Sequence, residues 1–126
     1  MKYMLLVCSD PAIEWTPADY TYVETHIDSW LADTVRRGVN LHGGRLQPTS
    51  SATTVRVRED EVLLTDGPFA ETKELIAGYD VIECADLDEA IEVAGQHPMA
   101  RYGAIEVRPF IDDQQANLWK RSDFPA

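Results

Sequence analysis

Residues 66–74 read Asp66-Gly67-Pro68-Phe69-Ala70-Glu71-Thr72-Lys73-Glu74. Gly67 permits a sharp turn and Pro68 has no amide hydrogen, so a strand that reaches Asp66 has to end there. Four ionisable side chains lie within this short stretch, at Asp66, Glu71, Lys73 and Glu74. The stretch therefore predicts a break between two strands, followed by a polar lip, meaning a loop of charged side chains beside the strand end.

The elements on either side of this break predict the fold. Residues 53–58 and 61–66 read as a β-hairpin that turns at Glu59-Asp60, and residues 75–84 as a long strand. Further strands are predicted at residues 2–8, 39–46 and 103–109, and helices from Pro17 to a stop at Gly38 and from Leu87 to about Gln96. This order predicts an α+β fold, a ferredoxin-like split βαβ domain with an inserted β-hairpin. We assign residues 1–110 to this domain and residues 111–126 to a tail that packs on the domain or on a dimer partner.

Both helices carry start signals and an apolar stripe. Thr16 is placed as the N-cap of the first helix, with Pro17 at its first position, and Asp86 begins the second with an acidic variant of the capping box. His97 follows the second helix, where a cation is favourable with the helix dipole. The predicted inner faces are Tyr20, Val23, Ile27, Trp30 and Leu31 in the first helix, and Leu87, Ala90, Ile91 and Ala94 in the second.

The first strand, residues 2–8, is apolar on both of its faces. A strand of this kind is covered on both sides, yet two helices cover only one face of a four-stranded sheet. A second copy of the chain is the economical cover for the other face, so we expect a homodimer that packs sheet to sheet. Trp119 and Phe124 are candidates to wrap onto the partner.

Composition narrows the class of protein. The chain has 126 residues, 44% of them hydrophobic and 26% charged, which suits one globular domain. Its net charge of −11 repels phosphate backbones and anionic lipids, so neither nucleic acid nor a membrane is expected as a partner. No apolar run reaches membrane-spanning length, and the N-terminal run is too short for a signal peptide. We expect a soluble, cytoplasmic protein.

The histidines and cysteines show no metal-binding pattern. His26, His42 and His97 lack a metal-ligand spacing, so no metal site and no cofactor are expected. Cys8 and Cys84 each end a strand that leads into a helix, and we expect those strands to be parallel neighbours. A redox pair is one interpretation of the two thiols, and two buried, inert thiols are the other.

An ordered set of short motifs runs along nearly the whole chain. It begins with Lys2-Tyr3-Met4-Leu5-Leu6 and includes residues 43–48, residues 52–58 and the signature at residues 66–74. Gly78-Tyr79 and Ile105-Glu106-Val107-Arg108-Pro109 complete it. On these residues the chain resembles the YCII-related family, in its DGPF branch.

The resemblance implies a dimeric α+β barrel built from ferredoxin-like subunits. Relatives in the wider superfamily include lactone isomerases and a dehydrochlorinase that acts on intermediates of aromatic degradation, and others accompany extracytoplasmic-function sigma factors. Where this family typically has an aromatic or aliphatic residue after Tyr79, the chain has Asp80. We therefore expect Asp80 to place an unusual charge in the ligand cleft.

Three residues are candidates for acid/base catalysis. Asp66, at a strand end beside a cleft, acts as a general base if burial raises its pKa, or else it is a turn residue that binds backbone amides. Glu71 either faces back toward Asp66 or lies in a solvated loop. His26 lies next to the apolar stripe of the first helix, where some relatives in the family place a catalytic histidine; the alternative is a surface or packed histidine.

Five residues are candidates for ligand binding: Arg108, Glu106, Asp80, His42 and Lys73. Glu106 and Arg108 project from one face of the last strand, where an arginine holds a carboxylate in two hydrogen bonds. The alternative is an ion pair within the chain or across a dimer, with Asp80 as one possible partner. His42 precedes a strand bend at Gly43-Gly44, and Lys73 is either part of the polar lip or a solvated charge.

Several functional hypotheses remain open at this point. In the first, the chain is a small-molecule-binding dimer that acts as a cofactor-independent isomerase or lyase-like enzyme on a small anionic or aromatic ligand, with a carboxylate as acid and base. In the second, it is a non-catalytic ligand-binding or regulatory dimer associated with an extracytoplasmic-function sigma factor system, and the signature clamps the hairpin. In the third, the acidic surface docks a protein partner.

Overall fold

The computed structural model describes residues 1–68 and 75–112. The strands and helices follow the predicted order, with bounds that differ from the prediction by a residue or two. Two short 3-10 helices, η1 (Thr49–Ser51) and η2 (Pro98–Arg101), lie between them. The main elements are β1 (Lys2–Ser9), α1 (Pro17–Arg36), β2 (Asn40–Arg45), β3 (Thr53–Arg58), β4 (Glu61–Asp66), β5 (Leu75–Glu83), α2 (Leu87–Gly95) and β6 (Gly103–Pro109).

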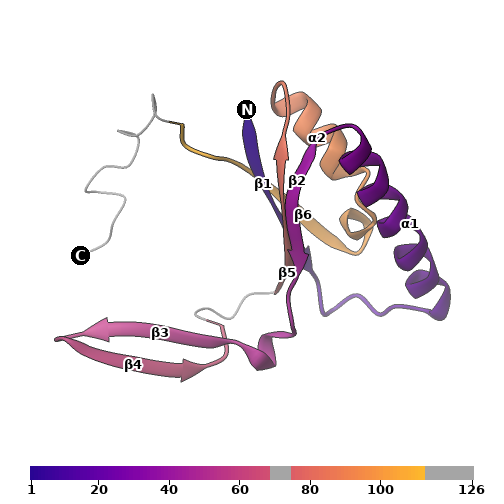
Figure 1. The fold of residues 1–126 in the computed structure, drawn as a ribbon. Coiled ribbons are helices and arrows are strands. Elements are labelled where there is room, and N and C mark those ends of the chain that lie inside the picture. The colour runs from indigo at the N-terminus through magenta and orange to yellow at the C-terminus, as the bar shows by residue number, and fades with distance from the viewer. Residues whose placement is uncertain (69–74, 113–126) are drawn as a thin grey trace.

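A four-stranded sheet of order β2-β5-β1-β6 forms the centre of the fold. Its paired strands are all antiparallel, and both helices pack on the same face (Figure 1). This arrangement confirms the predicted ferredoxin-like α+β fold. In β1, Leu5 pairs with Asp80 on one side and with Val107 on the other, so these three residues share the face that the helices cover.

The antiparallel pairing corrects the expectation for the two cysteines. Cys8 pairs with Ile76 near the start of β5, whereas Cys84 follows the end of β5 and donates its backbone N–H to Met1. The thiols therefore lie at opposite ends of the two strands, and the predicted parallel neighbours are wrong. Burial, aided by the charge of Glu89, raises the pKa of Cys84 to about 11, which keeps this thiol protonated and unreactive.

The predicted helix starts are confirmed. The Thr16 hydroxyl accepts from the Asp19 N–H at 3.3 Å, and the Asp19 carboxylate accepts from the Thr16 N–H at 2.7 Å, which makes a complete capping box. Asp86 caps α2 by accepting from the Glu89 N–H at 2.9 Å. In the part of the chain that the structure describes, no helix has the length and apolar character needed to cross a membrane.

The core lies between the sheet and the helices. Tyr3, Leu5 and Ile82 contribute from the sheet, and the Trp30 indole N–H donates to the Val93 carbonyl at 2.9 Å, which joins α1 to α2. The predicted inner face of α2 is only partly right. Its buried residues are Ala90, Val93 and Ala94, while Leu87 and Ile91 are 50% and 54% exposed because they lie on one flank of that stripe.

The hairpin of β3 and β4 extends from the lower end of the sheet, away from the helices (Figure 1). Its turn residues Glu59 and Asp60 have φ values of 51° and 64°, the left-handed backbone that a two-residue hairpin turn requires. Val55 pairs with Leu64 and Val57 with Val62, so one face of the hairpin is aliphatic, and all four side chains are exposed.

Replacement of Trp30 tests its role in joining the two helices. Trp30→Phe removes the hydrogen bond to Val93 and leaves a void in the core, so the free energy of unfolding should fall by about 1–3 kcal/mol. Trp15→Phe is the matched control, since Trp15 packs only against Tyr20 and Tyr102 among the described rings. Urea unfolding should show the larger loss for Trp30→Phe; equal losses would contradict a special role for this residue.

Candidate functional site

A cavity of about 290 Å³ lies between the sheet and the helices. Its walls are largely apolar and include Val7, Ile27, Trp30, Leu31 and Met99. Two buried ionisable side chains also line it: Asp80 from β5 and His97 from the segment that joins α2 to β6. An apolar cavity with a few convergent polar groups is the usual form of a small-molecule site.

Asp80 reaches the cavity from the middle of the sheet. Its side chain is 9% exposed, and the Asn40 side-chain amide donates to Oδ1 at 3.1 Å. Burial raises the pKa of this carboxyl group, and the hydrogen bond from Asn40 offsets part of that rise. Gly43 pairs with Asp80 across the strands, and a Cβ atom at position 43 would collide with Asp80 Oδ1. The missing side chain of Gly43 is therefore what makes room for the carboxylate.

His97 reaches the cavity from the opposite wall. It caps η2, where Nδ1 accepts from the Met99 N–H at 3.0 Å, and its ring meets Trp30 edge-on at 4.6 Å. The residue is 4% exposed, and burial lowers its pKa from 6.5 to about 4. His97 is therefore neutral at pH 7. The interpretation of His97 as a cation at a helix end is wrong, because the loss of hydration outweighs the helix dipole.

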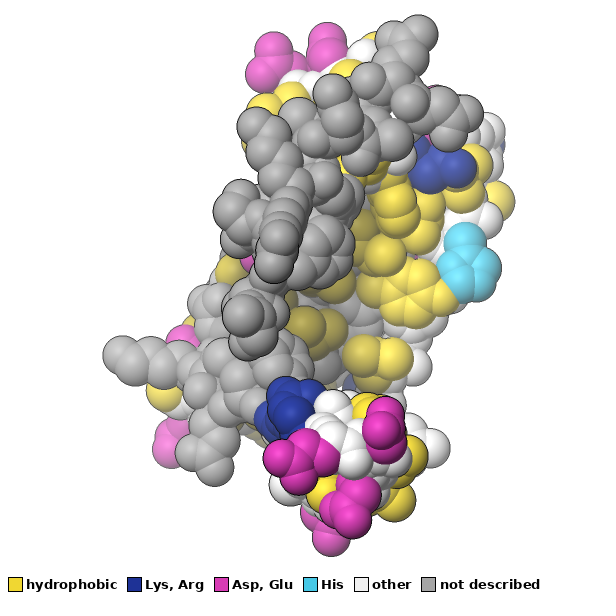
Figure 2. Space-filling model, turned by 90° about the vertical axis from the view of Figure 1, so that its left-hand side faces the viewer, with side chains coloured by type: hydrophobic (Ala, Val, Ile, Leu, Met, Phe, Trp, Pro, Cys, Tyr) yellow, Lys and Arg dark blue, Asp and Glu magenta, His cyan; other side chains and the backbone are white. Residues whose placement is uncertain are grey.

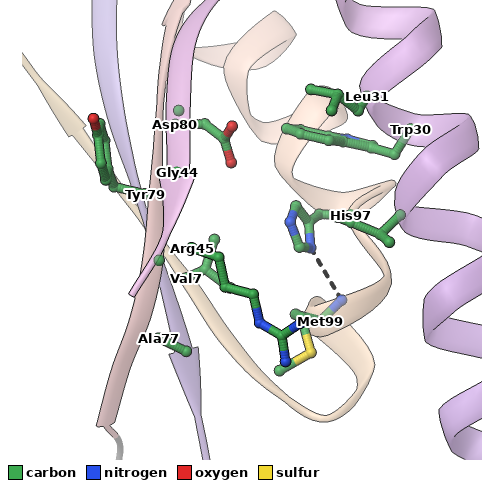
Figure 3. A pocket seen from close by; sticks show the side chains of 13 residues that line it. Val7, Trp30, Leu31, Gly44, Arg45, Ala77, Tyr79, Asp80, His97 and Met99 are labelled. Atoms are coloured by element: carbon green, nitrogen blue, oxygen red, sulfur yellow. Dashed lines mark hydrogen bonds between the residues drawn. The ribbon is translucent and has the colours of Figure 1, made fainter. Parts of the chain in front are cut away.

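The geometry fixes the tautomer of His97. Because Nδ1 accepts a hydrogen bond, the neutral ring carries its proton on Nε2. Figure 3 shows the Asp80 carboxylate pointing from the sheet toward the helices, and the His97 ring pointing from the helix layer toward the sheet. A carboxylate of raised pKa and a neutral N–H donor thus face one apolar cavity, which is the pairing that proton transfer next to a carbonyl group uses.

The structure places the three predicted acid/base residues elsewhere or does not describe them. Asp66 ends β4 on the exposed hairpin, opposite Thr53, and is not among the residues that line the cavity. His26 is exposed on α1, where its Nδ1 donates to the Tyr22 carbonyl at 2.7 Å and its ring stacks on Tyr22. Glu71 lies outside the described residues, so its predicted role stays a prediction.

Of the predicted ligand-binding residues that the structure describes, only Asp80 lines the cavity. Glu106 and Arg108 form an ion pair of 2.9 Å on the sheet face that the helices leave open, so the alternative of an ion pair within the chain is confirmed, with Glu106 and not Asp80 as the partner of Arg108. His42 lies on that same face, with Nδ1 2.8 Å from the Tyr79 hydroxyl oxygen. Lys73 lies outside the described residues. Within residues 1–68 and 75–112, no group of three or more His, Cys, Asp or Glu side chains is arranged to hold a metal ion.

The sequence analysis missed His97 as a site residue. Its position after α2 and before Pro98 is typical of a solvated helix end, whereas in the structure its ring is buried and packs against Trp30 of the other helix. One signal in the sequence was the charge of Asp80 in the middle of a largely apolar strand, because a charge there needs a polar partner or a function. Arg45, at the rim of the cavity, lies within the motif at residues 43–48, and nothing in that motif distinguishes it as a binding residue.

Comparison with known proteins gives two findings. The family model described as the YCII-related domain matches residues 1–113. An uncharacterized protein of Rhizobium meliloti (strain 1021) is 33% identical over 130 residues, a match that covers the full length of both chains. Neither finding names a reaction or a ligand.

The buried, neutral state of His97 predicts a pH dependence of stability. The unfolded chain binds this proton with a pKa near 6.5 and the folded chain with a pKa of about 4, so the folded state loses stability as the pH falls between those values. The loss attributable to His97 should be about 2 kcal/mol, allowing for residual solvent contact.

His97→Asn isolates this contribution, because an asparagine oxygen also accepts at the N-cap position of η2. Urea unfolding at pH 7 and pH 4.5 should show a smaller pH-dependent loss for the variant than for the wild type. The same loss in both proteins would mean that His97 is not buried in the neutral form.

Proposed function

The chain belongs to the YCII-related domain family, and we propose that it is a small-molecule enzyme of the isomerase or lyase type that works without a cofactor. The observation that carries this proposal is the position of Asp80 and His97 on opposite walls of one apolar cavity. Two ionisable groups whose pKa values are displaced by burial, beside one apolar cavity, form a combination typical of catalytic sites.

Asp80 is the proposed base. Its raised pKa brings the carboxylate closer to the working pH, which improves proton transfer. Asn40 holds Oδ1, while Oδ2 has no hydrogen-bond partner among the described residues and is available to a substrate. In the proposed step, Asp80 removes a proton from a carbon next to a carbonyl group, and the C–H electron pair moves toward the carbonyl oxygen.

His97 is the proposed donor to that oxygen. Its Nε2–H stabilises the negative charge that develops there, and because burial keeps the ring neutral, the group acts as a hydrogen-bond donor and not as an imidazolium acid. If Asp80 returns its proton to a different carbon, the reaction is an isomerisation. If the electron pair instead expels a leaving group as an anion, the reaction is an elimination, and the proton on Asp80 passes to water.

We also propose that the chain belongs to the DGPF branch and forms the homodimer of a dimeric α+β barrel. The signature at residues 66–74 supports the branch. The half-buried side chains of Met4, Leu6 and Tyr79 lie on the sheet face opposite the helices, and hydrophobic side chains gather over this face (Figure 2). A second copy that packs there would remove this apolar surface, and the exposed aliphatic face of the hairpin, from water.

A second candidate is a non-catalytic, ligand-binding or regulatory dimer that acts with an extracytoplasmic-function sigma factor. The contacts at the start of the signature favour a structural role for it. The Gly67 N–H donates to the Ala52 carbonyl and the Thr54 hydroxyl donates to the Gly67 carbonyl, each at 2.7 Å, so these residues close the base of the hairpin. In this case the cavity binds a small molecule without transferring its proton.

Asp80→Asn separates catalysis from binding. The variant keeps a side chain that accepts from Asn40 but loses the base, so proton transfer should fall at least about 100-fold. Since the substitution also removes a buried charge, the unfolding midpoint at pH 7 should stay level or rise. The measurement is deuterium incorporation from heavy water, followed by NMR, over a panel of unsaturated lactones and aromatic ketones.

Asp66→Asn tests the competing carboxylate in the same assay. Our proposal requires exchange that depends on Asp80. Exchange that survives Asp80→Asn, or exchange that is lost only in Asp66→Asn, would contradict the assignment of Asp80 as the base. No exchange with any compound of the panel would favour the non-catalytic alternative.

The homodimer has its own test in light scattering coupled to gel filtration. The wild-type chain of 14.2 kDa should elute with a mass near twice that value at micromolar concentration. Leu6→Glu places a charge on the open sheet face and should give the monomer mass. Leu87→Glu, on the exposed flank of α2, is the matched control and should leave the dimer intact. A monomeric wild-type protein would contradict the proposal.

A further inference from the structure

We infer that Arg45 is the anion-binding residue of the cavity and that its ligands are small monocarboxylic acids with an apolar or aromatic body. The inference rests on the proposed function in one respect, namely that this cavity is the ligand site. It does not require that the ligand reacts there.

Arg45 occupies the rim of the cavity. It is the last residue of β2 and pairs with Gly78 of β5. Its side chain extends from the sheet toward Met99 on the opposite wall (Figure 3). The same residue lines a wider outer hollow of about 790 Å³, formed with the segment between β1 and α1, so Arg45 lies where the hollow and the inner cavity meet.

The guanidinium group of Arg45 has no hydrogen bond or ion pair with any residue that the structure describes. Other arginines do have carboxylate partners: Arg36 and Arg37 bind Asp33, and Arg108 binds Glu106. A guanidinium group offers five N–H donors in a planar fork that matches a carboxylate in two parallel hydrogen bonds. In a chain of net charge −11, a cation beside an apolar cavity is therefore positioned to bind an incoming carboxylate.

Arg45 and Asp80 both line the sheet side of the cavity, which we call its floor, and they form no ion pair with each other. Gly43 pairs with Asp80 and Arg45 with Gly78, so the two charged residues lie two register positions apart on neighbouring strands, a distance along the strand of roughly 7 Å. The glycines leave the floor between them without side chains. A ligand whose carboxylate binds Arg45 at the rim would thus place its apolar body, and any carbon that Asp80 attacks, deeper in the cavity.

The outer hollow indicates that one carboxylate is preferred to two. Asp10, Glu14 and Glu24 line it together with Trp15 and Tyr20, and Arg45 is its only cationic side chain among the described residues. A second carboxylate on the ligand would meet these acidic groups without a cation to balance it. The ligand class is therefore a monoanion whose apolar body fits the inner cavity.

The test compares carboxylic acids with their carboxamides, which have nearly the same shape and no charge. The probes are a panel of monocarboxylates from benzoate and phenylacetate to 2-naphthoate, each with its amide, and binding is measured by isothermal titration calorimetry. For at least one pair the wild-type protein should bind the acid about tenfold or more tightly than the amide, as a charge-assisted pair predicts. Terephthalate should bind more weakly than benzoate.

Two variants assign that preference to a residue. Arg45→Gln should remove the preference for the acid and leave the affinity for the amide within about twofold. Arg108→Gln makes the same charge change on the opposite sheet face and should keep the preference. The inference is overturned if no acid of the panel binds more tightly than its amide, or if Arg108→Gln removes the preference as fully as Arg45→Gln does.

The outcome is separable from that of the proposed function. Acid binding that depends on Arg45, together with proton exchange that does not depend on Asp80, would sustain this inference and defeat the catalytic proposal. Exchange that depends on Asp80, with acids and amides bound equally well, would do the reverse.

Discussion

The close approach of β2 to β5 at Gly43 is the constraint on which the site depends. A carboxylate inside the core requires space and a hydrogen-bond donor, and here Gly43 supplies the space while Asn40 supplies the donor. A Cβ atom at position 43 would collide with Asp80 Oδ1, so any other residue there requires the carboxylate to move. The same two strands also carry Arg45 and leave Gly78 bare, so one pairing register arranges the base, the rim cation and the open floor between them.

The second wall of the site depends on how the helices pack. The indole N–H of Trp30 in α1 donates a hydrogen bond to the Val93 carbonyl in α2, and the indole ring packs against His97. The residue that joins the two helices therefore also holds the imidazole in place. Burial then moves the pKa of His97 down and that of Asp80 up. Both shifts disfavour the charged form of the side chain. At pH 7 the buried charge of Asp80 therefore costs stability, whereas His97 is neutral at that pH and carries no such cost. A buried carboxylate with a single hydrogen-bond donor lowers the stability of the fold, and such groups are typical of functional sites.

Local signals in the sequence were sufficient for the fold. The capping residues Thr16 and Asp86, the left-handed turn at Glu59-Asp60 and the break at Gly67-Pro68 each act within a few residues, and the structure keeps all of the predicted elements around them. The site was less predictable, because it depends on which face of a strand turns inward. Alternation showed that Glu106 and Arg108 share a face, but only the packing of the helices makes that face the outer one and turns Asp80 and Arg45 inward. The burial of His97 could not be predicted from its neighbours in the sequence, since Trp30, which packs against its ring, comes from a distant part of the chain.

The central claim is that His97 faces the cavity as a neutral imidazole with its proton on Nε2, opposite the Asp80 carboxylate. Long-range ¹H–¹⁵N NMR of the histidine rings between pH 5 and pH 8 tests it most directly, because the nitrogen shifts distinguish both tautomers and the imidazolium ion. The structure predicts a His97 ring that stays neutral across this range, with Nδ1 unprotonated. A His97 ring that titrates near pH 6.5, or one that carries its proton on Nδ1, would contradict this account of the site.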